Sequence, residues 1–267
     1  MSGHPIIALD HVTVWRSSDG VRRAIVDDVT WRVESGEHWA IVGPNGAGKT
    51  TMLRIAGAQM RPSAGTVSVL GGLFGEAYLP DLRRRIGMIE PGLGRRFYPE
   101  QRVIDVVLTG IGGTILLPDE PVDAEIAAAH AVLDRVGLGE LAMRTFVSCS
   151  EGERARTLLA RGLMADAPLV LFDEPAAGLD LAGRELLLRT IAEVVSERTQ
   201  LSTVTVTHHI EELPATTTHA LLLQSGRVLA SGPVADVLQD ELLSACFGLP
   251  LRVQEVNGRR FVLASAR

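Results

Sequence analysis

The residues best suited to chemistry lie in two short segments, and the first surrounds the only lysine of the chain. Among 26 basic residues, Lys49 is the single lysine. Lysine carries a compact charge on a flexible stem, whereas the planar guanidinium of arginine does not fit inside a tight backbone ring. The stretch is Gly43-Pro44-Asn45-Gly46-Ala47-Gly48-Lys49-Thr50, a glycine, four residues and then Gly-Lys-Thr. The spacing indicates a phosphate-binding loop that needs the smaller cation.

The segments on either side of the loop are those that such a site requires. Residues 39–42 are apolar and predict a strand that enters the loop, and residues 51–56 predict the helix that leaves it. Inward-facing backbone amides and the positive end of the helix dipole can then hold a triphosphate. We expect Lys49 to bridge the β- and γ-phosphates and the Thr50 hydroxyl to bind Mg²⁺. The alternative is an ordinary glycine turn between a strand and a helix.

The second segment is a pair of carboxylates, Asp173 and Glu174, directly after the apolar run at 169–172. This run suits a buried parallel strand, and ligands collect at the carboxyl ends of such strands. We expect Asp173 to reach Mg²⁺ and Glu174 to orient or deprotonate an attacking water. The acidic turn alone is weak evidence, but together with the glycine-rich loop it indicates phosphoryl transfer from a nucleotide.

The order of the motifs resembles that of the ATP-binding cassette (ABC) ATPases, over nearly the whole chain. Residues 150–153, Ser-Glu-Gly-Glu, are similar to the core Ser-Gly-Gly-Gln of the family signature, although two of the four positions differ. A hydroxyl, a bare amide and a helix start are suited to face a γ-phosphate. The stretch also fits a helix cap, with Ser150 as N-cap and Glu153 three residues later. The two interpretations are compatible.

The resemblance implies roles for further residues. Trp15 stands where the family has an aromatic residue that stacks on adenine, and the alternative is a half-buried strand residue. His208 follows an apolar strand and stands where the family has a histidine that contacts the γ-phosphate, although a lone histidine is more often structural. The implied nucleotide-binding residues are Trp15, Gly43, Pro44, Asn45, Gly46, Ala47, Gly48, Lys49, Thr50, Thr51, Ser150, Gly152 and Asp180. The implied catalytic residues are Lys49, Glu174 and His208, and the implied metal ligands are Thr50, Asp173 and Glu90.

The resemblance also implies the fold and the assembly. The implied fold is α/β. It consists of a P-loop NTPase core of the RecA-like kind, an inserted helical subdomain and an N-terminal antiparallel β region. We expect one domain over residues 1–267, with the core at about 1–90 and 167–240 and the helical subdomain at about 91–166. In the family, the signature of one subunit completes the nucleotide site of the other. We therefore expect a dimer, most simply a homodimer, that encloses two ATP with Mg²⁺.

Two segments lie outside this pattern. In the extension at 241–267, apolar residues alternate around Asn257-Gly258 and predict a β-hairpin to which the sequence assigns no function. Where transporters have the glutamine of the Q-loop, this chain has Pro91, which offers neither a side-chain oxygen nor an amide. Glu90, one residue earlier, is the candidate substitute ligand. The pattern is closest to importer cassettes of the metal-chelate and molybdate kind.

Composition limits the partners and the compartment. The net charge is −6, which does not favour generic binding to nucleic acid. The arginine clusters at 83–85, 95–96 and 259–260 are expected to form solvated surface. The chain has two cysteines, and we identify neither a secretory signal nor a stretch of the roughly 20 apolar residues that a membrane-spanning helix needs. We therefore expect a cytoplasmic protein, peripheral on the cytoplasmic face of a membrane.

Two functions are compatible with this pattern. The first is the ATPase subunit of an ABC transporter, docked on a separate integral membrane permease through the helical insertion and the Pro91 region. The second is a soluble ABC ATPase that acts on a cytoplasmic partner, which the missing glutamine supports. A nucleotide-binding switch with little turnover is disfavoured because Glu174 is present.

Overall fold

The computed structural model describes residues 5–18, 21–117, 120–164 and 167–264. The chain divides into two compact units, the first made of Met1–Leu82 and Ser202–Arg267, and the second of Arg83–Leu201.

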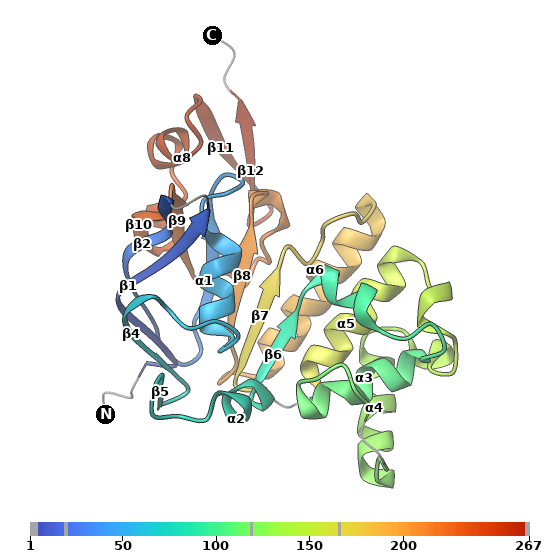
Figure 1. Ribbon diagram of the computed structural model, residues 1–267. Helices are drawn as coiled ribbons and strands as arrows, with labels where there is room; N and C mark the ends of the chain where they lie inside the picture. The colour runs from blue at the N-terminus through green and yellow to red at the C-terminus, as the bar shows by residue number, and fades with distance from the viewer. Residues whose placement is uncertain (1–4, 19–20, 118–119, 165–166, 265–267) are drawn as a thin grey trace. The chain divides into compact units, whose positions relative to one another are not determined.

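The N-terminal part of the first unit is an antiparallel sheet with strand order β2-β1-β4-β5 (Figure 1). Its long strand β2 alternates buried and exposed residues toward its end, with Val29, Trp31 and Val33 buried and their neighbours exposed. This period of two is that of a sheet with one face on a core. The strands are β1 (Ile7–Ser18), β2 (Val21–Val33), β4 (Ala64–Val69) and β5 (Gly72–Leu73). The predicted N-terminal antiparallel region is present.

The same unit contains a second group of strands, in which β3 runs parallel to both β8 and β9. Strand β10 pairs antiparallel with β9. Both β3 and β8 are buried almost throughout, as expected for parallel strands covered on both faces. The elements are β3 (His38–Val42), α1 (Lys49–Ala56), β8 (Ser202–Thr207), η4 (Ile210–Glu212), β9 (His219–Gln224) and β10 (Arg227–Pro233). The predicted strand before the loop is confirmed, and the helix after it begins at Lys49.

The first unit ends in two short helices and a hairpin, drawn in orange and red in Figure 1. Strands β11 and β12 pair antiparallel from Leu251 opposite Ala264 to Val256 opposite Arg259, with Asn257 and Gly258 in the turn. Both turn residues have positive φ, the backbone that a two-residue hairpin loop needs. The elements are α7 (Val234–Val237), α8 (Asp240–Phe247), β11 (Leu251–Val256) and β12 (Arg259–Ala264).

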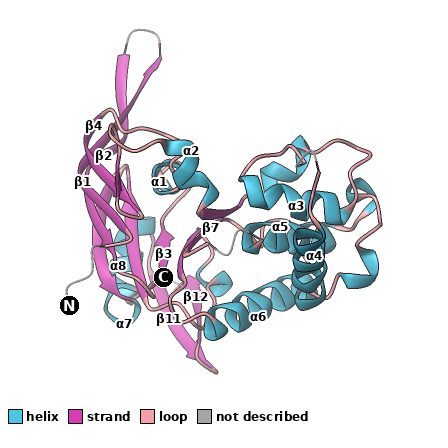
Figure 2. Cartoon of the chain, turned by 90° about the horizontal axis from the view of Figure 1, so that it is seen from below, coloured by secondary structure: helices cyan, strands magenta, loops and turns pink. Residues whose placement is uncertain are grey.

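The second unit combines the parallel strands β6 and β7 with a group of helices (Figures 1 and 2). Helix α5 packs closely on β6, because a Cβ on Gly87 would lie 2.3 Å from the carbonyl oxygen of Gly162. A larger residue at Gly87 would therefore push the helix off the strand. The elements are β6 (Ile86–Ile89), η1 (Pro91–Arg96), α3 (Val103–Gly112), α4 (Asp123–Arg135), η2 (Gly139–Leu141), η3 (Phe146–Ser148), α5 (Glu151–Leu163), β7 (Leu169–Asp173) and α6 (Leu181–Glu197). Helix α2 (Leu79–Arg84) lies at the boundary of the two units.

The helices of the second unit share one core with its strands. Helix α3 is buried over most of its length, and its Val103, Val106 and Val107 are completely covered. They pack in one cluster with Leu133 of α4 and Leu159 of α5. The apolar stretch that begins at Val103 is therefore a core helix, which ends at Gly112. Across the described ranges of the chain, no helix combines the length and the apolar character that crossing a membrane requires.

Candidate functional site

The glycine-rich loop closes around its own lysine. The Lys49 side chain is only 6% exposed, and its Nζ donates hydrogen bonds to the carbonyl oxygens of Gly43, at 2.8 Å, and Pro44, at 3.1 Å. The ammonium thus lies inside a ring formed by the backbone of the loop. A guanidinium is too broad and too flat for that place. This geometry gives the physical reason for the single lysine.

Two glycines of the loop are fixed by backbone from other parts of the first unit. A Cβ on Gly43 would lie 2.1 Å from the carbonyl oxygen of Leu223. A Cβ on Gly48 would lie 2.6 Å from the carbonyl oxygen of Ile25, and Gly48 also has φ +105, a region that side chains rarely adopt. The loop is further tied by a hydrogen bond from Gly226 N to Ala47 O at 3.0 Å. The path of the loop is therefore set before any ligand arrives.

A pocket opens beside this loop at Gly46. It is lined by residues of the β1–β2 ribbon, among them Arg16 and Arg23, which lie opposite each other in the sheet, and by Ser225. The bare backbone of Gly46 and two guanidinium groups make this pocket suitable for an anion. Trp15 does not line it.

Trp15 lies on β1 opposite Ala24 and is 44% exposed. The guanidinium of Arg22 lies over its ring, 5.7 Å from the centroid. An exposed flat face with a cation nearby is compatible with base stacking. Thr50 and Thr51 lie half-buried in the first turn of α1, next to the loop.

The carboxylates Asp173 and Glu174 lie where β7 ends, as the sequence predicts. Glu174 has φ +50, and it is the one described non-glycine residue of the second unit with a positive φ. Such a conformation is uncommon outside glycine, and it concentrates at functional sites. A hydrogen bond from Ala177 N to Glu174 O, at 3.1 Å, closes the turn that follows. The strand end thus presents Glu174 in a left-handed backbone conformation, within a hydrogen-bonded turn.

Asp180 is the N-cap of α6. Its Oδ1 accepts a hydrogen bond from Gly183 N at 2.7 Å. This bond satisfies one of the free amides at the helix start, so Asp180 has a structural role within its own segment. The next residue, Leu181, is 67% exposed.

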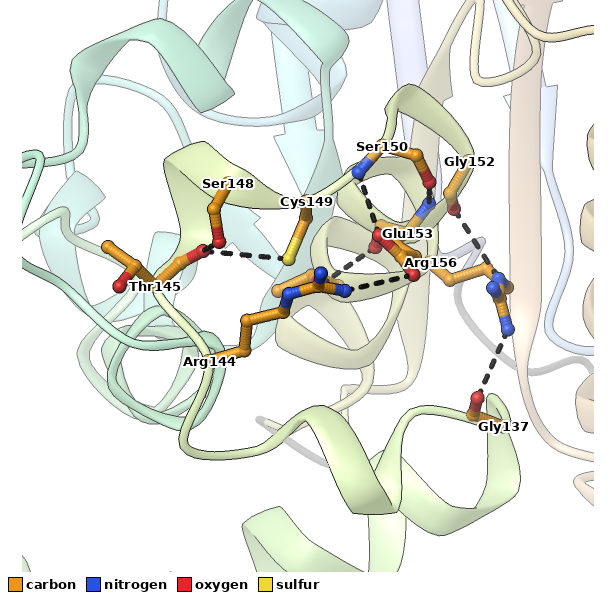
Figure 3. Close-up of polar contacts among 10 residues, drawn as sticks. Gly137, Arg144, Thr145, Ser148, Cys149, Ser150, Gly152, Glu153 and Arg156 are labelled. Carbon is orange, nitrogen blue, oxygen red and sulfur yellow. Dashed lines mark hydrogen bonds and ion pairs between the residues drawn. The ribbon is translucent and has the colours of Figure 1, made fainter.

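The signature-like stretch forms a complete capping box at the start of α5 (Figure 3). Ser150 N donates to Glu153 Oε2 at 2.7 Å, and Glu153 N donates to Ser150 Oγ at 3.3 Å. The hydrogen bond from the Ser150 amide is the main cause that lowers the pKa of the Glu153 carboxyl from its ordinary value. The cap interpretation is therefore confirmed. Gly152 differs from Gly43 and Gly48 of the loop, because a Cβ placed on it would meet no atom within 4 Å.

Cys149 precedes this helix and is 5% exposed (Figure 3). Its Sγ lies 3.7 Å from the carbonyl oxygen of Thr145, and burial raises the pKa of the thiol. The other cysteine, Cys246, is buried as well, and both are free thiols. The thiol inside the signature is thus shielded and largely protonated at neutral pH.

Glu90 lies at the end of β6 and precedes the short helix η1 that begins with Pro91. It is half-buried, and its carbonyl oxygen accepts a hydrogen bond from Leu93 N at 2.9 Å. A groove in the second unit opens beside η1. Apolar side chains form its walls and charged ones its rim, and they include Ile89, Phe97, Phe146, Leu158, Arg95, Glu151 and Arg154.

His208 follows the last residue of β8. It is half-buried, and its ring centroid lies 4.0 Å from that of His209. Thr207, which is completely buried, places its Oγ1 3.2 Å from Glu212 Oε2. His209 N donates to the same hydroxyl at 3.0 Å. The Thr207 hydroxyl, directly before His208, therefore contacts two groups that follow His208, the His209 amide and the Glu212 carboxylate.

The donor types suit the expected ligands. Hydroxyl and carboxylate oxygens, as on Thr50, Asp173 and Glu90, are those that Mg²⁺ prefers. In the ranges that the structure describes, no group of three or more His, Cys, Asp and Glu side chains is placed to hold a metal by itself.

Sequence reasoning missed some residues and misplaced others. Arg16 and Arg23 were not predicted, since the β1–β2 pairing contains register shifts that hide which residues share a face. The arginine clusters at 83–85 and 95–96 are exposed as predicted, but Arg259 and Arg260 are half-buried. For that third cluster the prediction of solvated surface was wrong, because β12 packs against η4.

Comparisons with known proteins identify the family of this chain. The family described as "ABC transporter" matches residues 26–177. An uncharacterised ABC transporter ATP-binding protein of Bacillus subtilis is 37% identical over 258 residues, which are 96% of each chain. A hemin import ATP-binding protein of Nocardia farcinica is 36% identical over 93% of this chain and 85% of its own. A manganese transport ATP-binding protein of Bacillus subtilis is 32% identical over 91% of this chain and 92% of its own.

Solved structures share the fold. A transporter described as of metal-chelate type, in an inward-facing conformation, has a TM-score of 0.78 at 24% identity and covers 99% of both chains. A dimeric ATP-binding cassette bound to ADP and Pi has a TM-score of 0.75 at 24% identity and covers 85% of this chain and 98% of its own. The α/β cassette fold predicted from the sequence is confirmed. Because the family match spans more than half of its length and the relatives align along nearly all of it, this chain belongs to the ABC transporter family as an ATP-binding, ATP-hydrolysing subunit.

Proposed function

We propose that this subunit works as a homodimer around two Mg-ATP and drives a separate membrane permease that imports a metal ion or a metal chelate. The observation that carries the dimer is the open space at Gly152, next to the capped start of α5. The capping box uses the amides of Ser150 and Glu153, and the open side of Gly152 leaves room for an outside anion at the remaining amides of this helix start. The cargo class is supported by the hemin and manganese importers among the relatives.

The residues of the first unit hold the nucleotide in this proposal. Amides from Gly43 to Thr51 and the ammonium of Lys49 bind the phosphates, and Trp15 stacks on adenine. The hydroxyl of Thr50 and the carboxylate of Asp173 hold Mg²⁺, with Glu90 as a further ligand. Bound there, Mg²⁺ neutralises charge on the phosphate oxygens.

Hydrolysis then depends on positioned groups. Glu174 orients the attacking water and accepts its proton while the bond to the leaving ADP breaks. His208 donates a hydrogen bond to the γ-phosphoryl group. Ser150 and Gly152 of one subunit, with Asp180 at the interface, face the γ-phosphate held by the other subunit. ATP binding closes the dimer, and hydrolysis to ADP and phosphate loosens it.

The permease is proposed to dock in the groove beside η1. Phe97 and Phe146 give this groove apolar walls, and its rim carries Arg95 and the ion pair of Arg154 with Glu151. A cytoplasmic segment of the permease with one apolar and one acidic side chain fits such a surface. The subunit would then lie on the cytoplasmic face of the membrane. Pro91 favours the second candidate, an ATPase that acts on a cytoplasmic partner, because the usual glutamine is missing.

Trapping the closed dimer tests the proposal. Glu174→Gln keeps the shape of the side chain but removes the base, so ATP should bind and the dimer should accumulate in size-exclusion chromatography. Glu193→Gln, on the exposed face of α6, is the matched control and should elute as the wild type does. A monomer peak for Glu174→Gln at saturating ATP and Mg²⁺ would contradict the dimer.

The partner is tested on the native protein. Membranes from cells that produce the full chain are solubilised gently, and the proteins that co-purify with it are identified. Recovery of a polytopic membrane protein supports the permease. Recovery from the cytosol, alone or with a soluble partner, supports the second candidate.

A further inference from the structure

The C-terminal hairpin is attached to the segment that follows His208. Strand β12 contacts η4, and Arg259 Nη2 donates a hydrogen bond to the carbonyl oxygen of Glu211 at 2.6 Å. The last carbonyl oxygens of a helical turn lack partners within the turn, and a cationic donor there is favourable. Arg259 therefore caps η4 at the end distant from His208.

The position of Arg259 is itself fixed. Its guanidinium lies 5.7 Å from the ring centroid of Phe261, two residues along the same strand. Partly buried apolar residues of the hairpin, Leu251, Val253 and Val262, pack against the core cluster that contains Ile210 and Leu213. The hairpin thus covers η4 and the residue after it.

The other edge of the hairpin is tied to α8. Leu251 N donates to Ser244 Oγ at 2.8 Å, and Val253 N donates to Asp240 Oδ1 at 2.7 Å. Helix α8 is in turn bound to the end of β9, because Gln224 Nε2 donates to the carbonyl oxygens of Ala245 and Cys246. The hairpin is therefore anchored to the body of the unit and does not move with η4 alone.

His208 lies in a short span between two fixed points. On one side, Thr207 is buried at the end of β8 and its hydroxyl contacts Glu212 at 3.2 Å. On the other side, Glu212 N donates to His209 O at 3.1 Å, inside the turn that Arg259 caps. If η4 loosens, the hydrogen bond from Glu212 N to His209 O is lost, and the Thr207 hydroxyl loses its contact with Glu212. The placement of His208 thus depends on η4.

We infer that Arg259 and the hairpin that carries it are a positioning device for His208 in ATP hydrolysis. This inference rests on the role proposed above for His208. The device acts on the rate of the hydrolytic step, because the phosphate loop that binds ATP is held by other contacts. It gives the C-terminal extension, which the sequence left without a function, a part in the reaction.

The test compares substitutions of two adjacent arginines in the full-length chain. Arg259→Met keeps an apolar stem against Phe261 but removes the donor, and Arg259→Lys restores a cationic donor. Arg260→Met is the control, because Arg260 pairs with Glu255 inside the hairpin at 3.2 Å. We expect Arg259→Met to lower kcat for ATP about 10-fold with the Kd for ATP within about 2-fold. Arg259→Lys should recover most of the rate, and Arg260→Met should match the wild type.

Coupling to His208 separates positioning from general stability. In a double-mutant cycle, Arg259→Met should add no further loss in a His208→Ala background, since the group that it positions is gone. Hydrogen exchange of the Glu212 and Leu213 amides should be faster in Arg259→Met than in Arg260→Met.

Each contrary result has a distinct meaning. A full additional 10-fold loss in the double mutant, or equal rates for Arg259→Met and Arg260→Met, overturns the positioning role while the role of His208 stands. If His208→Ala alone hydrolyses ATP at the wild-type rate, the proposed role of His208 is wrong, and the inference fails with it. Faster exchange in η4 would then mark Arg259 as purely structural.

Discussion

Two helices begin next to a glycine, at Gly48 in the first unit and at Gly152 in the second, and the surroundings of the two glycines differ. Gly48 is enclosed, with positive φ and the backbone of Ile25 against the place of a Cβ, and Lys49 is held by carbonyls of its own loop. Gly152 is open on that side, and its helix is capped by its own Ser150 and Glu153. The first glycine is enclosed by contacts within its own unit, whereas the second faces open space.

The largest effect is expected where the loop is most enclosed. Lys49→Arg preserves the charge, but the guanidinium cannot occupy the backbone ring around the ammonium. We expect ATP affinity to fall at least about 100-fold, as a loss of several kcal/mol of phosphate binding implies. Isothermal titration with ATP and Mg²⁺ measures this. An affinity equal to that of the wild type would refute the argument from the single lysine.

Alanine substitutions at Gly48 and Gly152 should have opposite effects on folding stability. Gly48→Ala forces a Cβ against Ile25 O in a strained backbone region, and we expect a loss of about 2–4 kcal/mol of folding free energy. Gly152→Ala meets open space in the first turn of a helix, so stability should rise slightly, by up to about 1 kcal/mol. Thermal unfolding of both variants checks this.

The ATPase activity of Gly152→Ala gives a second test of the open helix start. Gly152→Ala should fold well yet hydrolyse ATP at least about 10-fold more slowly, because its new methyl group would meet the partner nucleotide. Ala155→Gly, one turn later in α5, is the control for helix propensity. Full activity of Gly152→Ala would mean that nothing packs on this helix start.

A smaller effect is expected at the capping box. Its hydrogen bond from Ser150 N lowers the pKa of Glu153, so the stabilisation is present above the ordinary value of 4.5 and is lost as the pH falls below it. Glu153→Gln keeps an acceptor for Ser150 N but removes the charge near the helix start, so it should cost about 0.3–1 kcal/mol at pH 7. The difference from the wild type should shrink as the pH falls from about 5 toward 3. Urea unfolding at several pH values measures it, and a difference independent of pH would contradict the assignment.

The smallest effect concerns Cys149. Because its thiol is buried and protonated, a bulky maleimide should leave both the thiol and ATP hydrolysis nearly unchanged in the native protein at pH 7. Both cysteines should react after unfolding in urea. Rapid labelling of Cys149 with loss of activity would show that the segment before α5 opens readily.

What the sequence determined by itself is local. The strand, loop and helix around Lys49, the acidic end of β7 and the capping box at Ser150 all depend on residues within a few positions of each other. Their hydrogen bonds close short rings, so periodicity and residue type predict them. The turn at Asn257-Gly258 is predictable for the same reason.

Only the tertiary structure decided the contacts between distant segments. The fit of Gly43 against Leu223, the pairing that brings Arg16 and Arg23 to Gly46, and the bond from Arg259 to Glu211 join residues far apart in the chain. A single residue of register shift would turn each of these side chains to another face. Residue types along one sequence carry no information on that register, and for this reason Arg259 was predicted to be an ordinary surface arginine.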